Sequence, residues 1–345
     1  MKMKLKALAI STALLGGLAA APAQAFVYAD SSLMISGLVI TVTPGGLLPR
    51  TFSFTNTNSA VLNGAGDFHS ATCGGAPGAP GVTNDCSPGV GPRLNPAAAN
   101  APGGSAAAFR GNTDFTYKGP GGGLQFSNSA SSIDRSELTL DGATAIRQIA
   151  ESQLIGGLSA SATADIQSVS GFTFSFTLAA PGSLSLSFAA NPDQFAQILE
   201  ASGGLFSAQS TLAASFKLQQ DTGGNQSASW APRGTAANDC VASGTSGGSA
   251  IACTETNDSQ DLNSTIGTTT NGTSAALSHG DVTFTLFGIT ITGLGAGNYT
   301  LTLASNSKTQ LRRQVVPEPE SLLLLGIGVA ALGLGSRRRQ KKQAA

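Results

Sequence analysis

Apolar and polar residues alternate along most of the middle of the chain. The clearest case is the segment 172–178, where three phenylalanines and one leucine alternate with serine and threonine. Side chains with a two-residue period point to opposite faces of an extended chain, so this pattern predicts strands with one buried face. The same alternation recurs in seven further segments: 34–43, 51–56, 158–167, 183–188, 211–218, 281–287 and 298–303.

These segments together predict an all-β fold. Strands with one apolar face bury it when two antiparallel sheets pack face to face. We therefore expect an antiparallel β-sandwich, similar to a jelly roll, formed by residues 26–314.

One segment has the features of a short helix instead. Asn191 can cap a helix, Pro192 fits its first turn, and Asp193 suits its positive end. Apolar residues within 195–199 share one helical face, and Gly203 is a suitable stop. The sequence therefore predicts one helix between strands.

Two long segments, 73–108 and 221–280, lack apolar periodicity. The first is rich in glycine, proline and alanine, and the second in serine, threonine, asparagine and glycine. Such composition is typical of surface loops. We expect both to be loops that extend from the sandwich.

The four cysteines lie in these two segments. Cys73 and Cys86 are separated by twelve residues, and so are Cys240 and Cys253. An even number of cysteines in an exported chain indicates disulfides, and four cysteines allow three pairings. Pairing Cys73 with Cys86 and Cys240 with Cys253 closes the smallest rings. A metal site made of all four is disfavoured because no Cys-x-x-Cys spacing occurs.

The first 25 residues have the organisation of a secretory signal peptide. Three lysines precede an apolar stretch at 7–20, and Ala23 and Ala25 form a small-x-small cleavage site. We expect the mature chain to start at Phe26, after export by the Sec machinery.

The last 31 residues, 315–345, contain a turn, an apolar run and a basic tail. The turn is Pro317-Glu318-Pro319, and the tail between 337 and 342 includes Arg337, Arg338, Arg339 and two lysines. The apolar segment 321–335 is about 22 Å long as a helix, shorter than the roughly 30 Å hydrocarbon core. It therefore suits a temporary transmembrane anchor whose basic end stays in the cytoplasm.

This C-terminal segment resembles the PEP-CTERM sorting signal of exported bacterial proteins. The resemblance rests on the Pro-Glu-Pro turn, the Leu/Gly/Ala run and the arginine cluster, in that order. It implies that an exosortase, a membrane-embedded processing enzyme, cuts the chain near the turn. It also implies a Gram-negative source, and a body that is released outside the cell or displayed on its surface, often in exopolysaccharide or biofilm matrix.

The charge of the body differs from that of the whole chain. The chain has 19 basic and 19 acidic residues, and removing both ends leaves 11 basic and 17 acidic residues, a net charge of −6. Nucleic-acid binding requires a positive surface, so the body is not expected to bind nucleic acid.

Candidate catalytic residues are few. Ser246 lies in a G-x-S-x-G pattern, but the strand and helix that a nucleophile elbow requires are not indicated around it. The only histidines, His69 and His279, lie in turn-like contexts. We expect no catalytic residue, no metal and no cofactor.

Two weaker binding hypotheses remain. Trp230 can stack on a sugar ring, although packing of its own loop is the more common role of such a tryptophan. The cluster Asn257, Asp258, Asp261 and Asn263 offers oxygen ligands for calcium, without EF-hand spacing. Three interpretations of the function follow from the sequence. The first is a non-enzymatic surface or matrix protein, the second a carbohydrate- or calcium-binding adhesion module, and the third a secreted hydrolase.

Overall fold

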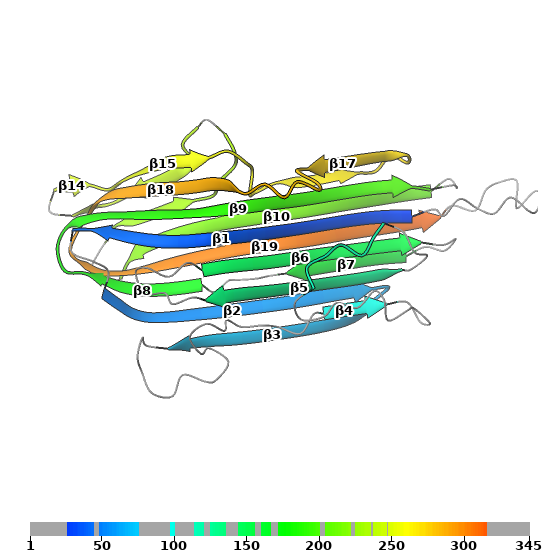
Figure 1. Cartoon of the computed structure of the whole chain (residues 1–345), viewed down its shortest axis with the longest axis horizontal. Helices are drawn as coiled ribbons and strands as arrows, with labels where there is room; N and C mark the ends of the chain where they lie inside the picture. The colour runs from blue at the N-terminus through cyan, green and yellow to red at the C-terminus, as the bar shows by residue number, and fades with distance from the viewer. Residues whose placement is uncertain are drawn as a thin grey trace, which may run out of the picture.

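The molecule consists of two broad antiparallel sheets whose strands follow one long axis (Figure 1). The computed structural model describes residues 26–44, 48–75, 97–100, 114–120, 125–135, 144–155, 160–166, 172–200, 204–221, 225–235, 237–246 and 248–315. Among these residues no helix occurs. The predicted all-β class is therefore confirmed.

The first sheet has eight strands in the order β15-β18-β9-β1-β6-β5-β4, with β17 also paired to β9. Its strands are β1 (Phe26–Thr43), β4 (Ala97–Asn100), β5 (Phe126–Arg135), β6 (Thr144–Ile155), β9 (Gly182–Leu199), β15 (Ala252–Asp258), β17 (Thr273–Leu277) and β18 (Thr285–Leu294).

The second sheet has nine strands in the order β12-β11-β10-β19-β7-β2-β3, with β8 also between β19 and β2, and β16 paired to β10. Its strands are β2 (Leu48–Leu62), β3 (Ala65–Gly75), β7 (Ala160–Ile166), β8 (Phe172–Leu178), β10 (Gly204–Gln220), β11 (Ser227–Trp230), β12 (Cys240–Ser243), β16 (Thr265–Thr268) and β19 (Gly297–Val315). A separate hairpin pairs β13 (Thr245–Ser246) with β14 (Ser249–Ala250). The sheets are thus broader than those of a jelly roll, which has eight strands in total.

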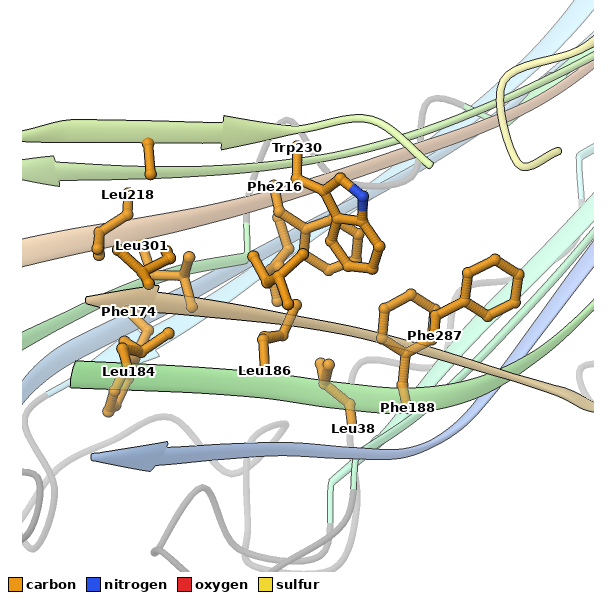
Figure 2. Close-up of a cluster of buried hydrophobic side chains, with 14 of the residues drawn as sticks. Leu38, Phe174, Leu184, Leu186, Phe188, Phe216, Leu218, Trp230, Phe287 and Leu301 are labelled. Atoms are coloured by element: carbon orange, nitrogen blue, oxygen red, sulfur yellow. The ribbon is translucent and has the colours of Figure 1, made fainter. Parts of the chain in front are cut away.

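Most of the space between the sheets is filled by a cluster of aliphatic and aromatic side chains. Phe188 of β9 stacks on Phe287 of β18 and on Phe216 of β10, with ring centroids 5.2 Å apart in both pairs. Trp230 of β11 packs against Phe188 and Phe216 (Figure 2). Alternate phenylalanines and leucines of the predicted strands 172–178, 183–188 and 211–218 therefore form the core, as their two-residue period requires. The predicted strand 281–287 differs, because β18 begins only at Thr285 and the alternating residues Val282, Phe284 and Leu286 are exposed.

A smaller apolar cluster lies at the other end of the long axis. It joins Val27 of β1, Leu154 of β6, Ile198 of β9, Phe206 of β10 and Leu311 of β19. Burial of these side chains holds the two sheets together where β1 begins and β19 ends.

Between the two apolar clusters lies a belt of buried polar side chains that bond across the sheets. Gln148 of β6 donates to the Ser305 hydroxyl of β19 at 2.6 Å and accepts from Ser307 at 3.2 Å. Four further cross-sheet contacts are Ser131 to Asn56, Ser152 to Thr309, Ser31 to the Thr211 carbonyl and Ser210 to the Asp30 carbonyl. Serine hydroxyls reach main-chain carbonyls of the opposite sheet, so the sheets approach each other more closely here than the usual 10 Å or so.

The helix predicted from Asn191 onwards is wrong, because these residues belong to β9. The strand is paired along one side with β1, from Phe26↔Leu199 to Thr43↔Ser183. Pro192 lies between the stretches that pair with β18 and β17 on the other side. A proline without an amide hydrogen is accepted where a strand has no neighbour.

The prediction that 221–280 is one long loop is also wrong. The segment contains seven short strands, β11 to β17, which extend both sheets or form the small hairpin. Its consecutive strands β16 and β17 pair with β10 and β9, in different sheets, so this part of the chain closes one side of the sandwich. The expected loop at 73–108 contains the end of β3 and the strand β4, and the remainder lies outside the described residues.

The polar belt leads to a stability prediction. Gln148→Leu keeps the side-chain volume but leaves the Ser305 and Ser307 hydroxyls without this partner, so we expect a loss of about 2–4 kcal/mol in the free energy of unfolding. Combining it with Ser305→Ala and Ser307→Ala should recover most of that loss, because the two hydroxyls that lost the Gln148 amide are then removed as well. Chemical denaturation of the wild type, Gln148→Leu and the triple variant measures both effects, and a triple variant less stable than Gln148→Leu would contradict the account.

Candidate functional site

The end of β19 lies directly before the predicted sorting turn. Arg313 is buried and forms a bidentate ion pair with Glu200, with its Nε 2.6 Å from Oε1 and its Nη2 2.8 Å from Oε2. The main chain of Glu200 is held in turn by both polar atoms of the Asn271 side chain. Val315 pairs with Gly204 and ends the strand. The last strand is therefore fixed two residues before Pro317.

The sorting residues themselves, Pro317, Glu318, Pro319 and Arg337–Arg339, lie outside the described part of the chain. The same holds for Ala23 and Ala25 of the expected signal-peptide cleavage site. Phe26, the expected first residue of the mature chain, is the first residue of β1. Cleavage at that position stays a prediction.

Trp230 is not available to a ligand. Its side chain is buried in the main core, and its indole Nε1 donates to Glu255 Oε1. A cavity of only about 10 Å³ borders it, about the volume needed for one water molecule. The hypothesis that Trp230 stacks on a sugar is therefore wrong, and its other interpretation, packing of its own segment, is confirmed.

The Cys240–Cys253 disulfide is confirmed, with Cα atoms 5.6 Å apart. It links β12 at the edge of the second sheet to β15 at the edge of the first. The bond therefore joins the two sheets on the side that β16 and β17 also close. The predicted Cys73–Cys86 pair lies outside the described side chains.

Ser246 and the histidines lie in separate places. Ser246 belongs to β13 and lies beside Gly295, just after the end of β18. His279 is hydrogen-bonded to Asp193, and His69 to Asp67, two residues away. Among the described contacts, neither histidine is paired with the Ser246 hydroxyl.

A cluster of buried acidic and aromatic side chains lies on the outer face of the first sheet. Asp30, Glu151 and Asp193 come from the neighbouring strands β1, β6 and β9, and all three are buried. Their side chains share one face because Asp30 is opposite Glu151 and Ser32 is opposite Asp193. No sequence pattern indicates this cluster, since the three residues are far apart in the chain and only the strand register brings them together.

Two segments cover this acidic cluster. Glu151 Oε1 accepts from the Tyr28 hydroxyl at 2.8 Å and from the amides of Lys118 and Gly119 at 2.7 and 2.8 Å. Burial and the nearby charges of Glu151 and Asp30 raise the pKa of Tyr28 well above its usual value, so it stays a hydrogen-bond donor. These bonds hold the segment 114–120 against the sheet.

His279 brings the second covering segment. Its ring stacks on Phe195 with centroids 4.3 Å apart, and its Nδ1 lies 3.0 Å from Asp193 Oδ1. The other oxygen of Asp193 accepts from the Gly280 amide at 3.0 Å. Ligand atoms of Asp30, Asp193 and His279 lie within 4.8 Å of one another, so they also have the composition of a cation-binding set. The polar residues Asn191 and Asp193, which suggested a helix cap, bind this loop instead.

The predicted calcium cluster is rearranged in the structure. Asp261 and Asn263 are used locally, since Asp261 accepts from the Asn263 amide and Asn263 bonds to the main chain of Ala214 and Pro232. Asp258 lies instead with Asp239 and Glu255, whose ligand oxygens are within 4.8 Å of one another. The sequence therefore located one of the three residues of this acidic set.

Comparison with known proteins places the C-terminal segment in a recognised class. A model of the PEP-CTERM protein-sorting motif matches residues 315–339. The all-β body is therefore followed by a sorting motif, and the chain is a PEP-CTERM-containing exported protein. The resemblance seen in the Pro-Glu-Pro turn and the arginine cluster is confirmed. No curated protein and no solved structure matches the chain. Within the described residues no helix is long and apolar enough to cross a membrane.

The Glu151 contacts generate a prediction about the acidic cluster. Glu151→Ala removes the acceptor of one tyrosine hydroxyl and two amides, so we expect the free energy of unfolding to fall by about 2–4 kcal/mol. Glu151→Gln keeps an oxygen at this position and should lose less than half as much. Denaturant titration of the two variants beside the wild type measures this. Equal losses in both would show that the acceptor geometry is unimportant.

Proposed function

We propose that this protein is a non-enzymatic component of the cell surface or its matrix, delivered there by export and C-terminal processing. The observation that carries the proposal is the PEP-CTERM motif, which begins at the last residue of the last strand. The Sec machinery exports the chain, the segment 321–335 holds it in the membrane, and an exosortase cuts near Pro317–Pro319. The body then stays outside the cell, in contact with exopolysaccharide.

The structure of the body supports a role without catalysis. Trp230 is enclosed in the core, and the Ser246 hydroxyl is not joined to a histidine in the described contacts. The disulfide between β12 and β15 and the cross-sheet hydrogen bonds suit a rigid protein that withstands conditions outside the cell. The net charge of −6 keeps such a body soluble and disfavours simple attraction to acidic polymers.

The processing step has a direct test. The mass of the protein recovered from outside the cell should correspond to a chain that starts at Phe26 and has lost Arg337–Arg339. Replacing Glu318 and both flanking prolines with alanine should leave the tail attached and the protein in the membrane fraction. A wild-type extracellular product that retains the arginines would contradict the proposal.

A second candidate function is calcium binding by Asp239, Glu255 and Asp258. The specific observation is that Asp258 Oδ1 is buried and has no hydrogen-bond partner among the described residues, whereas Oδ2 accepts from the amides of Arg233 and Gly234. Burial raises the pKa of Asp258, as do the charges of Glu255 and Asp239, although the two amides oppose the shift. A cation bound here would contact Asp258 Oδ1 and neutralise the acidic charges. The lone pairs of this oxygen that accept no hydrogen bond and the raised pKa of Asp258 therefore both favour a cation at this site.

The calcium hypothesis predicts that Asp258→Asn is more stable than the wild type without calcium and that it lacks the stabilisation that calcium gives the wild type. In calcium-free buffer at pH 7, Asp258→Asn should raise the Tm by about 2 °C, since a raised pKa means that the ionised form destabilises the fold. This difference should vanish near pH 3, where the wild-type carboxyl is protonated. Added calcium should raise the Tm of the wild type and not of Asp258→Asn. The exposed control Asp281→Asn should behave like the wild type towards calcium, and a wild type that does not respond would end this candidate.

A further inference from the structure

The two ends of the body lie at the same end of the sandwich. Phe26 pairs with Ile155 and with Leu199, and Val315 pairs with Gly204. Val27, which follows Phe26, and Leu311, four residues before Val315, belong to one apolar cluster. Figure 1 shows β1 beginning and β19 ending on the same side of the molecule. We call this end, formed by Phe26, Ile155, Leu199, Leu205 and Val315, the exit pole.

The length of the connection limits how far the exit pole can be from a membrane. The apolar run of the sorting segment starts at Leu322, seven residues after Val315. Seven residues span at most about 25 Å. The central strands have 17 to 19 residues, which corresponds to a body about 60 Å long. When the apolar run that starts at Leu322 is in the bilayer, the exit pole is therefore within about 25 Å of the bilayer surface, whatever the tilt of the body.

Exposed leucines are placed at this pole. Leu199 at the end of β9 is 47% exposed, and Leu205 at the start of β10 is 63% exposed. Their neighbours Ile198 and Phe206 point into the core, so the two leucines lie on the outward faces of the two sheets. Phe26 and Ile155, which are half-buried, continue the apolar surface on the first sheet. Apolar side chains on both outer faces thus flank the point where the chain leaves the body.

We propose that the exit pole rests on the lipid surface while the precursor is anchored, with Leu199 and Leu205 at the boundary between headgroups and acyl chains. This inference rests on the proposed function, because it requires the sorting segment to be in the membrane. The opposite pole, which contains the β8–β9 turn at 179–181, is then held about 60 Å away. The body stands upright and offers that far pole and its flanks to the matrix.

Energy transfer to the lipid measures this orientation. The full-length chain is reconstituted in vesicles of phosphatidylethanolamine and phosphatidylglycerol that carry an acceptor dye on their headgroups. A small fluorescent amino acid replaces Gln314 at the exit pole or Ala180 in the far turn, both of which are exposed. We expect transfer from position 314 to exceed transfer from position 180 at least fivefold in the carbonate-resistant fraction.

The leucines are tested by variants of the same labelled protein. Leu199→Asp combined with Leu205→Asp should lower transfer from position 314 and expose the probe to an aqueous quencher. Val241→Asp is the matched control, because Val241 is 65% exposed on β12, and it should change neither reading. Denaturation curves of both variants establish that the body remains folded.

Each outcome has a distinct meaning. Equal transfer from positions 314 and 180 in carbonate-resistant protein would overturn the orientation and leave the proposed function intact. Unchanged transfer in the double variant would overturn the contact made by the leucines. Release of the wild-type chain by carbonate would overturn the membrane anchor and, with it, the inference. If the probe at position 314 were still shielded from the aqueous quencher in released protein, the chain's own apolar run 322–334 would be what covers Leu199 and Leu205.

Discussion

The first and last strands of the body are both central strands, and the remainder of the structure depends on their pairing. β1 is hydrogen-bonded to β6 on one side and to β9 on the other, and β19 is bonded to β10 on one side and to β7 and β8 on the other. A strand with two neighbours cannot leave without breaking both ladders. The sheets are therefore complete only when residues 26 to 315 are all present.

This constraint accounts for how closely the body adjoins the predicted signal-peptide cleavage site and the sorting motif. β1 starts one residue after Ala25, and the sorting motif matches from Val315, where β19 ends. A cut inside either strand would expose main-chain hydrogen-bonding groups and part of the apolar cluster at the exit pole. Cuts outside these limits leave the sandwich whole. The buried pair of Arg313 and Glu200 fixes the last strand close to that limit.

The polar belt gives the interior a register that apolar residues alone would not provide. A one-residue shift of a strand moves its side chains to the opposite face. In this protein a shift of β6 would turn Gln148 out of the interior and leave the buried hydroxyls of Ser305 and Ser307 without their bonds to it. The apolar clusters on either side supply most of the favourable burial energy, and the belt specifies which residues face each other.

The sequence predicted the strands whose alternation is strong and apolar, such as β8, together with the Cys240–Cys253 bond and the sorting motif. It failed where polar residues have tertiary partners. Asn191, Pro192 and Asp193 satisfy the local rules of a helix start, yet pairing with β1 and bonding to the 278–284 loop place them in a strand. The short strands between 221 and 280 were missed because serine, threonine and asparagine hide their alternation. The acidic cluster of Asp30, Glu151 and Asp193 depends on strand register, which spacing along the chain does not reveal.

The central claim is that the terminal strands are locked into the body as firmly as its core. Native-state hydrogen exchange of the exported protein tests it most directly. We expect amides at 27–35 in β1 and 298–313 in β19 to exchange as slowly as those of Phe188 and Phe216, through global unfolding alone. Exchange of either terminal strand through a separate opening of lower free energy would contradict the account.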